Sequence, residues 1–543
     1  FGSRATGTNT VTSDVDIALF GGRLTLTDQA RLAAALDKIP MAQSVDLMLY
    51  DSIESQTLRE HIRRQGIEWY ARTTRDEECD TALGSPSLLD CLPPDWERST
   101  LGAACERGGG NIQTGPFGSQ LHASDYRPVG IPSIMPQNLG DNRVIEDGIA
   151  RVGERDANRL TRYLVRAGDI VYSRRGDVER RALIGPREDG WLCGTGCLRV
   201  RLGENCVFPR YASYYLGHPV VREWIVRHAH GATMQNLNTA ILSACPFVIP
   251  PISEQRSIAH ILGTLDDRIE LNRRMNETLE AMARALFKSW FVDFDPVRAK
   301  MEGRDTGLPK EIADLFPNRL VDSELGDIPE GWQVRPLSEC IDVDRGLSYK
   351  GSGLSPDGLP MHNLNSVYEG GGYKDDGIKH YDGEHKPRHV VQPTDVIVAN
   401  TEQGHDRLLI GYAAVVPARY VPMGLFSHHL YRVRPKGSVN LGPDFICRLL
   451  NTRAMHDTIS GYATGTTVNM LPVDALKLPS MVVPSMKVMV RFSVVAEAVR
   501  YRREILVEES RTLAAIRDAL LPKLVSGKLR VKGTTNLRVA PIA

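Results

Sequence analysis

The sequence predicts an α+β multidomain protein in which a small α/β domain precedes two α/β globular regions, separated by two long helices that pair antiparallel as a coiled coil. Three observations support this class. Two segments carry apolar residues at alternating gaps of three and four, the stretches before these segments resemble each other, and an Asp-x-Asp pair follows a Gly-Ser pair near Phe1. Gaps of three and four are the pattern of a helix with one apolar face.

The first long helix is expected from Ser253 to Phe291. One gap of six near Leu271 interrupts its apolar stripe, which consists of Ile258, Leu262, Leu265, Ile269, Met275, Leu279, Met282 and Leu286. Asn272 and Asn276 would lie on or beside this stripe. A polar residue in that position often fixes the register of a coiled coil at some cost in stability.

The second long helix is expected from Ser485 to Leu521. Its stripe is more regular and consists of Phe492, Val495, Val499, Arg502, Leu506, Glu509, Leu513, Ile516 and Leu520. Pro522 should end the helix because proline has no amide proton to donate. About 36 helical residues form a rod of roughly 50 Å, which needs a partner. The alternative is that each helix lies on its own globular region.

Both helices belong to a duplication. Matching stretches begin at Trp96 and Trp332, at Gly168 and Thr394, and at His230 and Thr464, with offsets of about 236, 226 and 234 residues. The order of the matches is the same in both halves, so the small differences in offset indicate loop insertions. Each half is therefore a globular region of about 150 residues followed by a long helix.

Further motifs give the chain a resemblance to the specificity subunit of type I restriction-modification enzymes, over about Pro94 to Val531. The motifs are TGPFGSQL from Thr114, GIPSIMPQNL from Gly130, AGDIVYSRRGD from Ala167, IPPISEQRSIAHILGTLDDRIELNRRMNETLEAMARALFKSWFVDFDPV from Ile249, GLPKEIADLFPNRLVDSELGDIPEGW from Gly307 and LLPKLVSGKLRV from Leu520. The resemblance implies that each globular region is a target-recognition domain that reads one half of a bipartite sequence in double-stranded DNA. It also implies that the helices space these domains and dock the methyltransferase (M) subunits of a complex that includes motor-nuclease (R) subunits. This part would be non-catalytic and would need no cofactor.

The first residues, FGSRATGTNTVTSDVDIALF, resemble the opening motif of minimal nucleotidyltransferases of the polymerase-beta superfamily. The family's Gly-Ser pair corresponds to Gly2 and Ser3, its Asp-x-Asp pair to Asp14 and Asp16, and SVDLMLYD supplies Asp46 as a third carboxylate. Residues one apart in a strand point to the same face, so these carboxylates would bind Mg²⁺. Backbone amides of the Gly-Ser pair would bind the nucleotide phosphates.

The same resemblance implies a helix and most of a strand before Phe1. We therefore expect a domain truncated at its start, either an inactive remnant or part of a longer chain. If it is active, the alternative function of the whole chain is a magnesium-dependent nucleotidyltransferase of the adenylylating, toxin-antitoxin type, with the rest of the chain as targeting apparatus. A scaffold that uses only the coiled coil would leave the two recognition-like regions unexplained.

The best local candidate for DNA contacts in the first region is the cluster Arg174, Arg175, Arg180 and Arg181. Arginine pairs with phosphates and donates two hydrogen bonds to guanine. A solvated loop is the alternative. The second region is rich in histidine, at His380, His385, His389, His405, His428 and His429, in a spacing that fits no metal motif; surface or core positions are expected.

The composition of the chain limits its possible partners and its compartment. The 66 basic and 66 acidic residues cancel, so a DNA surface must be local or completed by partners. Nine scattered cysteines indicate reduced thiols in a cytoplasm, and Cys193 and Cys197 lack a second ligand pair for zinc. No apolar run is long enough to span a membrane and no signal peptide is recognised, so no membrane partner is expected.

These observations predict eight segments. They are a nucleotidyltransferase-like domain at 1–72, a linker at 73–94, a first recognition domain at 95–250, a central helix at 251–294, a crossing segment at 295–331, a second recognition domain at 332–484, a C-terminal helix at 485–531 and a tail at 532–543.

Overall fold

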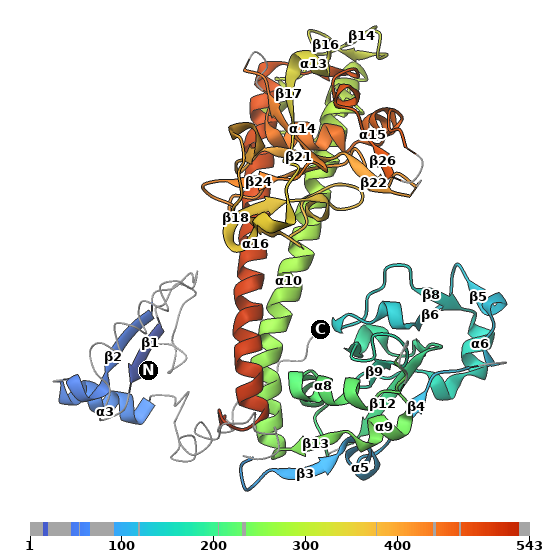
Figure 1. The fold of residues 1–543 in the computed structure, drawn as a ribbon, viewed down its shortest axis with the longest axis vertical. Coiled ribbons are helices and arrows are strands. Elements are labelled where there is room, and N and C mark those ends of the chain that lie inside the picture. Colours follow the sequence, from blue (N-terminus) through green and yellow to red (C-terminus); the bar gives the residue numbers. More distant parts are fainter. Residues whose placement is uncertain are drawn as a thin grey trace. The chain divides into compact units, whose positions relative to one another are not determined.

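The structure is a computed structural model, and it forms two compact units, Phe1–Glu270 with Glu509–Ala543, and Leu271–Glu508 (Figure 1). We call these unit 1 and unit 2. The residues that the structure describes are 15–19, 45–53, 55–65, 92–117, 120–204, 206–230, 235–375, 377–404, 406–437, 441–465 and 468–531. The boundary between the units crosses both long helices, so each unit contains a part of each helix.

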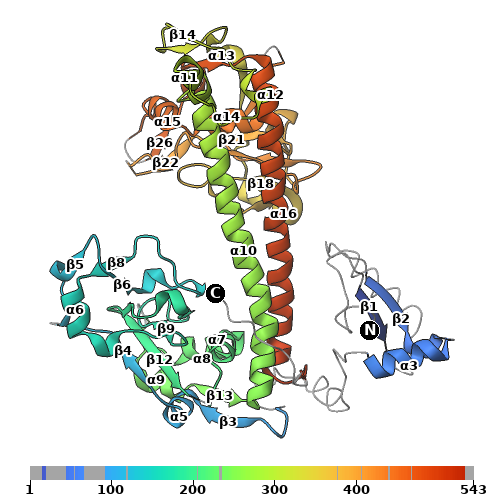
Figure 2. The same cartoon turned by 180° about the vertical axis from the view of Figure 1, so that it is seen from behind.

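The two long helices are α10 (Ile252–Phe291) and α16 (Met486–Val525). Within each unit they lie side by side (Figures 1 and 2). In unit 1, Arg517 binds Asp266 at 2.8 Å and Arg268 binds Glu509 at 2.7 Å. A residue later in α10 thus meets a residue earlier in α16, and the helices run antiparallel there.

The prediction that Pro522 ends the second helix is wrong, because α16 continues to Val525 with the proline inside it. Proline lacks an N–H, which removes one hydrogen bond, but it still accepts through its carbonyl. The Ser526 amide and hydroxyl donate to Pro522 O at 3.2 and 2.7 Å. These bonds stabilise the last turn beyond the proline.

The beginning of unit 1 contains two parallel strands, β1 (Val15–Leu19) and β2 (Val45–Leu49), whose register pairs Asp16 with Asp46. A short 3-10 helix, η1 (Tyr50–Ser52), and α3 (Gln56–Gln65) follow. Tyr50, Ile53 and Ile62 form a small buried cluster in this part of the chain.

We call residues 95–250, predicted as the first recognition domain, the first recognition region, and residues 332–484 the second. The first region contains two larger sheets, with strand orders β4-β12-β9-β10-β7 and β11-β6-β8-β5, and the pair β13-β3. The strands are β3 (Glu97–Thr100), β4 (Gly109–Thr114), β5 (Tyr126–Arg127), β6 (Ile131–Ile134), β7 (Asp141–Asn142), β8 (Ala150–Val152), β9 (Ile170–Ser173), β10 (Arg181–Leu183), β11 (Leu192–Cys193), β12 (Cys197–Gly203) and β13 (Pro246–Ile249). The helices are α5 (Leu101–Arg107), α6 (Glu154–Arg159), α7 (Pro209–Tyr215), α8 (Pro219–His228) and α9 (Thr239–Ala244), with 3-10 helices η3 (Ala123–Asp125), η4 (Pro136–Asn138), η5 (Thr161–Tyr163) and η6 (Pro186–Glu188).

The core of unit 1 joins residues that are far apart in sequence. Leu524 and Val525 at the end of α16 are fully buried in the same apolar cluster as Trp96 and Leu262. Just beyond them, Arg530 binds Asp95 at 2.8 Å and Glu254 at 2.7 Å. The C-terminal helix therefore completes the core at the base of the first recognition region.

Unit 2 begins with the rest of α10 and a crossing segment of α11 (Asp295–Met301), α12 (Lys310–Ala313), β14 (Leu320–Val321) and β15 (Ile328–Pro329). The second recognition region has sheets β17-β25-β21-β23 and β19-β18-β24-β20, with the pairs β16-β27 and β22-β26. Its strands are β16 (Gln333–Pro336), β17 (Ile341–Arg345), β18 (Leu354–His362), β19 (Lys379–Tyr381), β20 (Val390–Val391), β21 (Val396–Ala399), β22 (Thr401–Gln403), β23 (Ala413–Val415), β24 (Gly424–Phe426), β25 (Leu430–Pro435), β26 (Val468–Met470) and β27 (Ser480–Val483). Its helices are α13 (Leu337–Cys340), α14 (Pro443–Leu450) and α15 (Arg453–Ser460), with 3-10 helices η7 (Gly351–Gly353), η8 (Leu364–Ser366), η9 (Pro387–His389) and η10 (Val473–Leu476).

The two recognition regions share a sheet topology. The order β4-β12-β9-β10 of the first has its counterpart in β17-β25-β21-β23 of the second, and all these neighbours are antiparallel. The duplication seen in the sequence is therefore also a duplication of strand pairing. Among the described residues, no helix is long and apolar enough to cross a membrane.

Candidate functional site

A pair of arginines marks the same strand in both recognition regions. Arg199 and Arg201 alternate with Leu198, Val200 and Leu202 along β12, and these three apolar residues lie in the core. Because side chains of a strand alternate between its faces, both arginines point away from that core. In β25, Arg432 and Arg434 alternate in the same way with buried Tyr431 and Val433.

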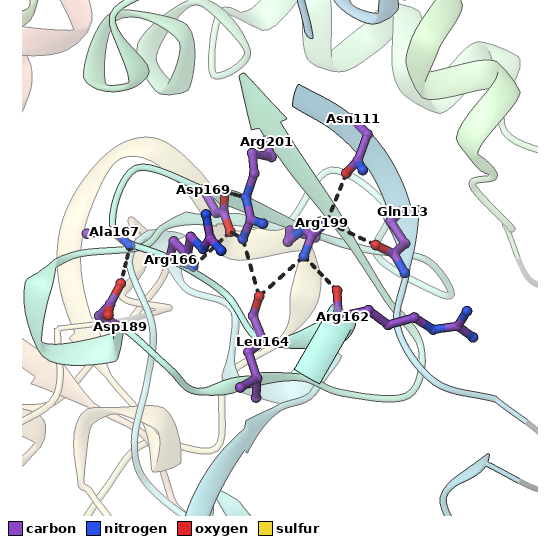
Figure 3. Close-up of polar contacts among 10 residues, drawn as sticks. All are labelled: Asn111, Gln113, Arg162, Leu164, Arg166, Ala167, Asp169, Asp189, Arg199 and Arg201. Atoms are coloured by element: carbon purple, nitrogen blue, oxygen red, sulfur yellow. Dashed lines mark hydrogen bonds and ion pairs between the residues drawn. The ribbon is translucent and has the colours of Figure 1, made fainter. Parts of the chain in front are cut away.

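Arg199 is almost fully buried and connects several loops of the first region (Figure 3). Its guanidinium donates to Asn111 Oδ1 at 2.8 Å and Gln113 Oε1 at 2.9 Å on the neighbouring strand β4. It also donates to the carbonyls of Arg162 at 2.9 Å and Leu164 at 3.2 Å. Burial lowers the pKa of Arg199, yet the acceptors around it stabilise the charged form.

Arg201 forms a bidentate ion pair with buried Asp169, at 2.8 and 2.6 Å (Figure 3). The Arg166 amide donates to the same carboxylate at 2.8 Å, so the turn before β9 is held from both sides. The second region repeats this arrangement: Arg434 binds Asp395 at 2.5 and 2.6 Å, and the Gln392 amide donates at 2.8 Å. We call each arrangement the Asp–Arg lock.

The residue before each locked aspartate has a positive φ. It is Gly168 in the first region, at +92°, and Thr394 in the second, at +72°. Glycine adopts this conformation freely, whereas a β-branched residue is strained in it. The two regions therefore share the backbone shape of this turn even where the side chain disfavours it.

The Asp–Arg locks lie at the beginning of strands β9 and β21. The loops that follow these two strands, at Arg174 and at Asn400, belong to the candidate site. After β9, the Arg174 amide donates to Gly196 O, and Arg174 O accepts from the Leu237 amide, both at 2.8 Å. After β21, the corresponding bonds join Asn400 to His429 at 3.0 Å and Leu471 to Asn400 at 2.8 Å. Three loops that are separate in sequence thus meet at the same place in each region.

The four predicted arginines separate into different environments. Arg175 is exposed, Arg174 is half-buried, and the Nε atom of Arg174 is buried without a hydrogen-bond partner among the described residues. Arg180 binds Asp177 at 2.8 Å, which neutralises part of its charge. Arg175 is therefore the exposed member of the cluster whose charge is not offset by a carboxylate among the described residues, and Arg174 is only partly accessible.

The prediction that Arg181 contacts DNA is wrong, because its side chain is buried. Its Nε donates to Ser213 O at 3.0 Å. A Cβ on Gly217 would lie 1.9 Å from the Arg181 guanidinium, so the glycine makes room for it. The sequence run of four arginines could not distinguish this inward position, since the strand β10 begins only at Arg181.

The second region has two histidines at the corresponding place, and the sequence pattern did not mark them as candidate site residues. His428 and His429 lie between β24 and β25, in the loop that corresponds to Gly194–Gly196, and their ring centroids are 3.9 Å apart. The pKa of His429 is lowered mainly by burial, and to a smaller extent by the charges of His428, Arg345 and Lys379. The shared strand motif, Arg-Val-Arg from Arg199 and from Arg432, could have revealed this correspondence.

The nucleotidyltransferase-like residues lie mostly outside the described residues. Gly2, Ser3 and Asp14 lie outside them, while the backbone of Asp16 and Asp46 is described within β1 and β2. The register places these two positions opposite each other on parallel strands. In the described part of the chain, no group of three or more His, Cys, Asp or Glu residues is arranged to hold a metal ion.

A cavity of about 1360 Å³ in unit 2 lies between α10, α16 and α14. At its edge, Glu280 of α10 accepts from Arg448 of α14 at 3.1 Å and also binds Arg503 of α16. This carboxylate therefore joins both long helices to the second recognition region.

Two family comparisons match different parts of the chain. Residues 95–281 match the family described as type I restriction modification DNA specificity domain. Residues 1–75 match the family described as polymerase beta nucleotidyltransferase.

Curated proteins match along most of their length. The chain is 24% identical over 453 residues to the type I restriction enzyme HindI specificity subunit of Haemophilus influenzae, covering 73% of this chain and 95% of that protein. It is 23% identical over 451 residues to the MjaIX specificity subunit of Methanocaldococcus jannaschii, covering 81% of this chain and 95% of that protein.

Solved structures also align with most of the chain. The specificity subunit from M. genitalium aligns at 14% identity and a TM-score of 0.49, covering 81% of this chain and 98% of that chain. The HsdS subunit from Thermoanaerobacter tengcongensis aligns at 16% identity and a TM-score of 0.29, with the same coverage.

Proposed function

We infer that this chain is the DNA sequence-specificity subunit of a type I restriction-modification complex. The observation that carries this conclusion is the match of residues 95–281 to the DNA specificity domain of that class. The two specificity subunits described above, each aligned over 95% of its own length, support it. The subunit binds double-stranded DNA and acts with methyltransferase (M) and motor-nuclease (R) subunits.

Each recognition region reads one half of a bipartite target. The duplicated sheets and Asp–Arg locks support this division, because they position the same three loops in each region. Loops on a rigid scaffold can vary in sequence without changing the fold, so the two regions can read different bases. Arg174 and Arg175 contact the DNA in the first region.

The helices α10 and α16 form an antiparallel coiled coil that sets the distance between the two half-sites and docks the M subunits. Ion pairs between the helices within each unit support this, Asp266 with Arg517 in unit 1 and Glu280 with Arg503 in unit 2. The complex acts in the cytoplasm. Its described cysteines are all free thiols, as expected of a reducing compartment.

A domain exchange tests the DNA-specificity function. Replacing Asp95 to Pro250 with the same region of a related subunit should change one element of the methylated sequence and leave the other intact. Methylation mapping in a host that carries the complete system is the measurement. A continuous palindromic target, or a change in both elements after the exchange, contradicts the proposal.

Substitution of Arg174 and Arg175 tests their proposed contacts with DNA. The double variant R174A/R175A should bind the target more weakly and lower the salt slope by about one for each lost phosphate contact. The sequence that is read should not change. The control R180A, in which the arginine already has a carboxylate partner, should have a smaller effect.

A second function is proposed for the first domain, in which Asp14, Asp16 and Asp46 bind Mg²⁺ for nucleotide transfer. The match of residues 1–75 and the register of Asp16 beside Asp46 favour it. Carboxylates on adjacent parallel strands are suitable ligands for this cation, and bound Mg²⁺ would neutralise a triphosphate. Gly2 and Ser3 would offer backbone amides to the phosphates.

The paired substitution D14N/D16N should abolish magnesium-dependent nucleotide binding without changing DNA recognition. Isothermal titration calorimetry with ATP and Mg²⁺ measures this. D51N is the matched control, because Asp51 lies just after β2 and is exposed. The proposal fails if the unsubstituted chain binds neither nucleotide nor Mg²⁺.

A further inference from the structure

We propose that the second recognition region binds DNA phosphates on a cationic surface formed by Arg345, Lys379, His428 and His429. This histidine–arginine surface is the counterpart of the Arg174–Arg175 surface in the first region. The inference rests on the DNA-specificity function and assigns the residues that serve it in unit 2.

The place of the surface follows from hydrogen bonds that the two regions share. The residue after β9, Arg174, donates its amide to Gly196 O, and the residue after β21, Asn400, donates to His429 O. Ser427, the first residue of the histidine loop, donates to His362 O, as Gly194 donates to Ile134 O in the first region. The histidines therefore occupy the loop that lies beside Arg174 and Arg175 in the other repeat.

The charged groups that lower the pKa of His429 are all positive. They come from His428 in the same loop, Arg345 at the end of β17 and Lys379 at the start of β19, while β22 contributes the neutral hydroxyl of Thr401 at 2.8 Å from His429 Nδ1. Two nearby carboxylates have other partners. Asp344 binds Arg432 at 2.5 Å, and Glu402 accepts from three backbone amides, at 2.9, 3.2 and 3.1 Å.

Positive charges gathered in this way favour an anionic ligand. Arg345 and Lys379 are exposed, so a phosphate can reach both. The Lys379 ammonium donates to Tyr349 Oη at 2.8 Å and lies 5.3 Å from its ring centroid. The Arg345 guanidinium lies 4.0 Å from the Met470 sulfur. An aromatic ring beside cations is a common feature of surfaces that bind nucleic acid.

Duplex DNA is the polyanion that fits an extended cation set. It carries one negative charge per roughly 1.7 Å of its axis, and contacts to it release counter-ions. A protonated histidine forms an ion pair with phosphate, whereas a neutral histidine can donate only a hydrogen bond. Burial and the surrounding positive groups lower the pKa of His429, and a bound phosphate opposes this shift, so affinity should increase as the pH falls.

Binding of full-length protein, assembled with its M subunits, to duplex carrying the mapped target tests the surface. The variant R345A/K379A should weaken binding roughly tenfold at 0.1 M salt and reduce the salt slope by about two, with the same sequence methylated. The variant R304A/K310A removes the same charge from exposed positions of the crossing segment and is the matched control. Fluorescence anisotropy over a salt series is the measurement.

A second variant, H428Q/H429Q, distinguishes the contribution of the two histidines to binding from that of Arg345 and Lys379. Wild-type affinity should rise between pH 7.5 and 6, and the variant should lose this rise while keeping its affinity at pH 7.5. R345A/K379A that binds like its control overturns the inference. So does a loss of M-subunit assembly with unchanged DNA affinity, since the surface would then dock an acidic protein. If wild-type protein shows no sequence-specific methylation, the DNA-specificity function itself fails.

Discussion

At the scale of single residues, the Asp–Arg lock depends on the buried charge of Asp169, whose side chain is 3% exposed. D169A leaves the Arg201 guanidinium and the Arg166 amide without their acceptor, and we expect a loss of about 3 kcal/mol of local stability. Hydrogen exchange of β9 and β12 measures it. D177A is the exposed control, with an expected change below about 0.5 kcal/mol.

The same lock allows a compensation test. Replacing both partners by apolar residues, D169L/R201M, removes the unpaired charge and should recover most of the stability lost in D169A. Faster exchange in the double variant than in D169A would show that the ion pair itself, rather than the penalty of leaving one partner unpaired, stabilises the turn.

His362 gives the second region a pH dependence. Burial lowers its pKa to about 3, from an ordinary value of 6.5, so the folded state keeps it neutral while the unfolded state binds a proton. Stability should therefore fall as the pH decreases from 6.5 towards 3, by up to about 1.4 kcal/mol per pH unit. The variant H362Q should show a shallower decline in urea unfolding. Equal slopes in both proteins would exclude His362 as the cause.

The residue types of the candidate site could be predicted from sequence, but their environments could not. Arginine clustering proposes Arg174 and Arg175, which stay predictions, yet the same cluster includes Arg181, whose side chain is buried. The histidines at 428 and 429 fit no motif, because their role depends on strand pairing with residues that are distant in sequence. Local patterns do not encode which side of a loop faces solvent.

At the scale of elements, Glu280 connects the two long helices to α14. Burial alone would raise the pKa of Glu280, but Arg448 and Arg503 outweigh burial and lower it. E280Q should cost about 1–2 kcal/mol at pH 7 in urea unfolding. Because a lowered carboxyl pKa stabilises the fold above the unfolded value of 4.5, the difference from wild type should disappear as the pH falls below that value.

Glu277 provides the control for this prediction, one turn earlier on α10. It pairs with Arg273 on the same helix and is 62% exposed. E277Q should cost only about 0.3–0.5 kcal/mol, as expected of an exposed pair within one helix. Equal losses in the two variants would mean that Glu280 acts only through its own helix.

Helix periodicity predicted both long helices to within a few residues, because their apolar stripes are long and regular. It placed the stripe of α16 less accurately: Arg502 is exposed, whereas Arg503 faces α10 and binds Glu280. A gap of three or four residues fits either arginine. Which of the two arginines faces α10 depends on Glu280 of that helix, which is too distant in sequence for local periodicity to include.

At the scale of the whole molecule, the proposed spacer can be lengthened. Insertion of one heptad after Glu270 in α10 and one after Glu508 in α16 keeps the coiled-coil pattern and adds about 10 Å of helix. The gap between the two DNA elements should grow by about three base pairs at 3.4 Å each, with both elements unchanged. Methylation mapping is the measurement.

Two outcomes would contradict the spacer role. They are an unchanged gap, or new bases in either element. The control is a seven-residue insertion in the crossing segment near Gly303, a turn outside both long helices. This variant should methylate the original sequence with the original gap.

The division into compact units could not be predicted from sequence. The sequence repeat predicts globular regions separate from the helices, whereas the structure groups the first globular region with the beginning of α10 and the end of α16. Burial decides this grouping: Leu262 and Leu524 are both fully buried in one cluster. Residues with more than 250 intervening positions cannot be matched by local periodicity.

The burial of Leu524 and Val525 beneath Trp96 has a consequence for biosynthesis. Residues 92–270 leave the ribosome before residues 524–530 are made, so until then this part lacks the Leu524 and Val525 side chains of its core and the Arg530 contacts to Asp95 and Glu254. Unit 2 is one contiguous segment, from Leu271 to Glu508, so all of its residues are made before unit 1 is complete. Residues 92–270 are therefore made before unit 2 but mature after it, and premature termination before α16 leaves their apolar core uncovered.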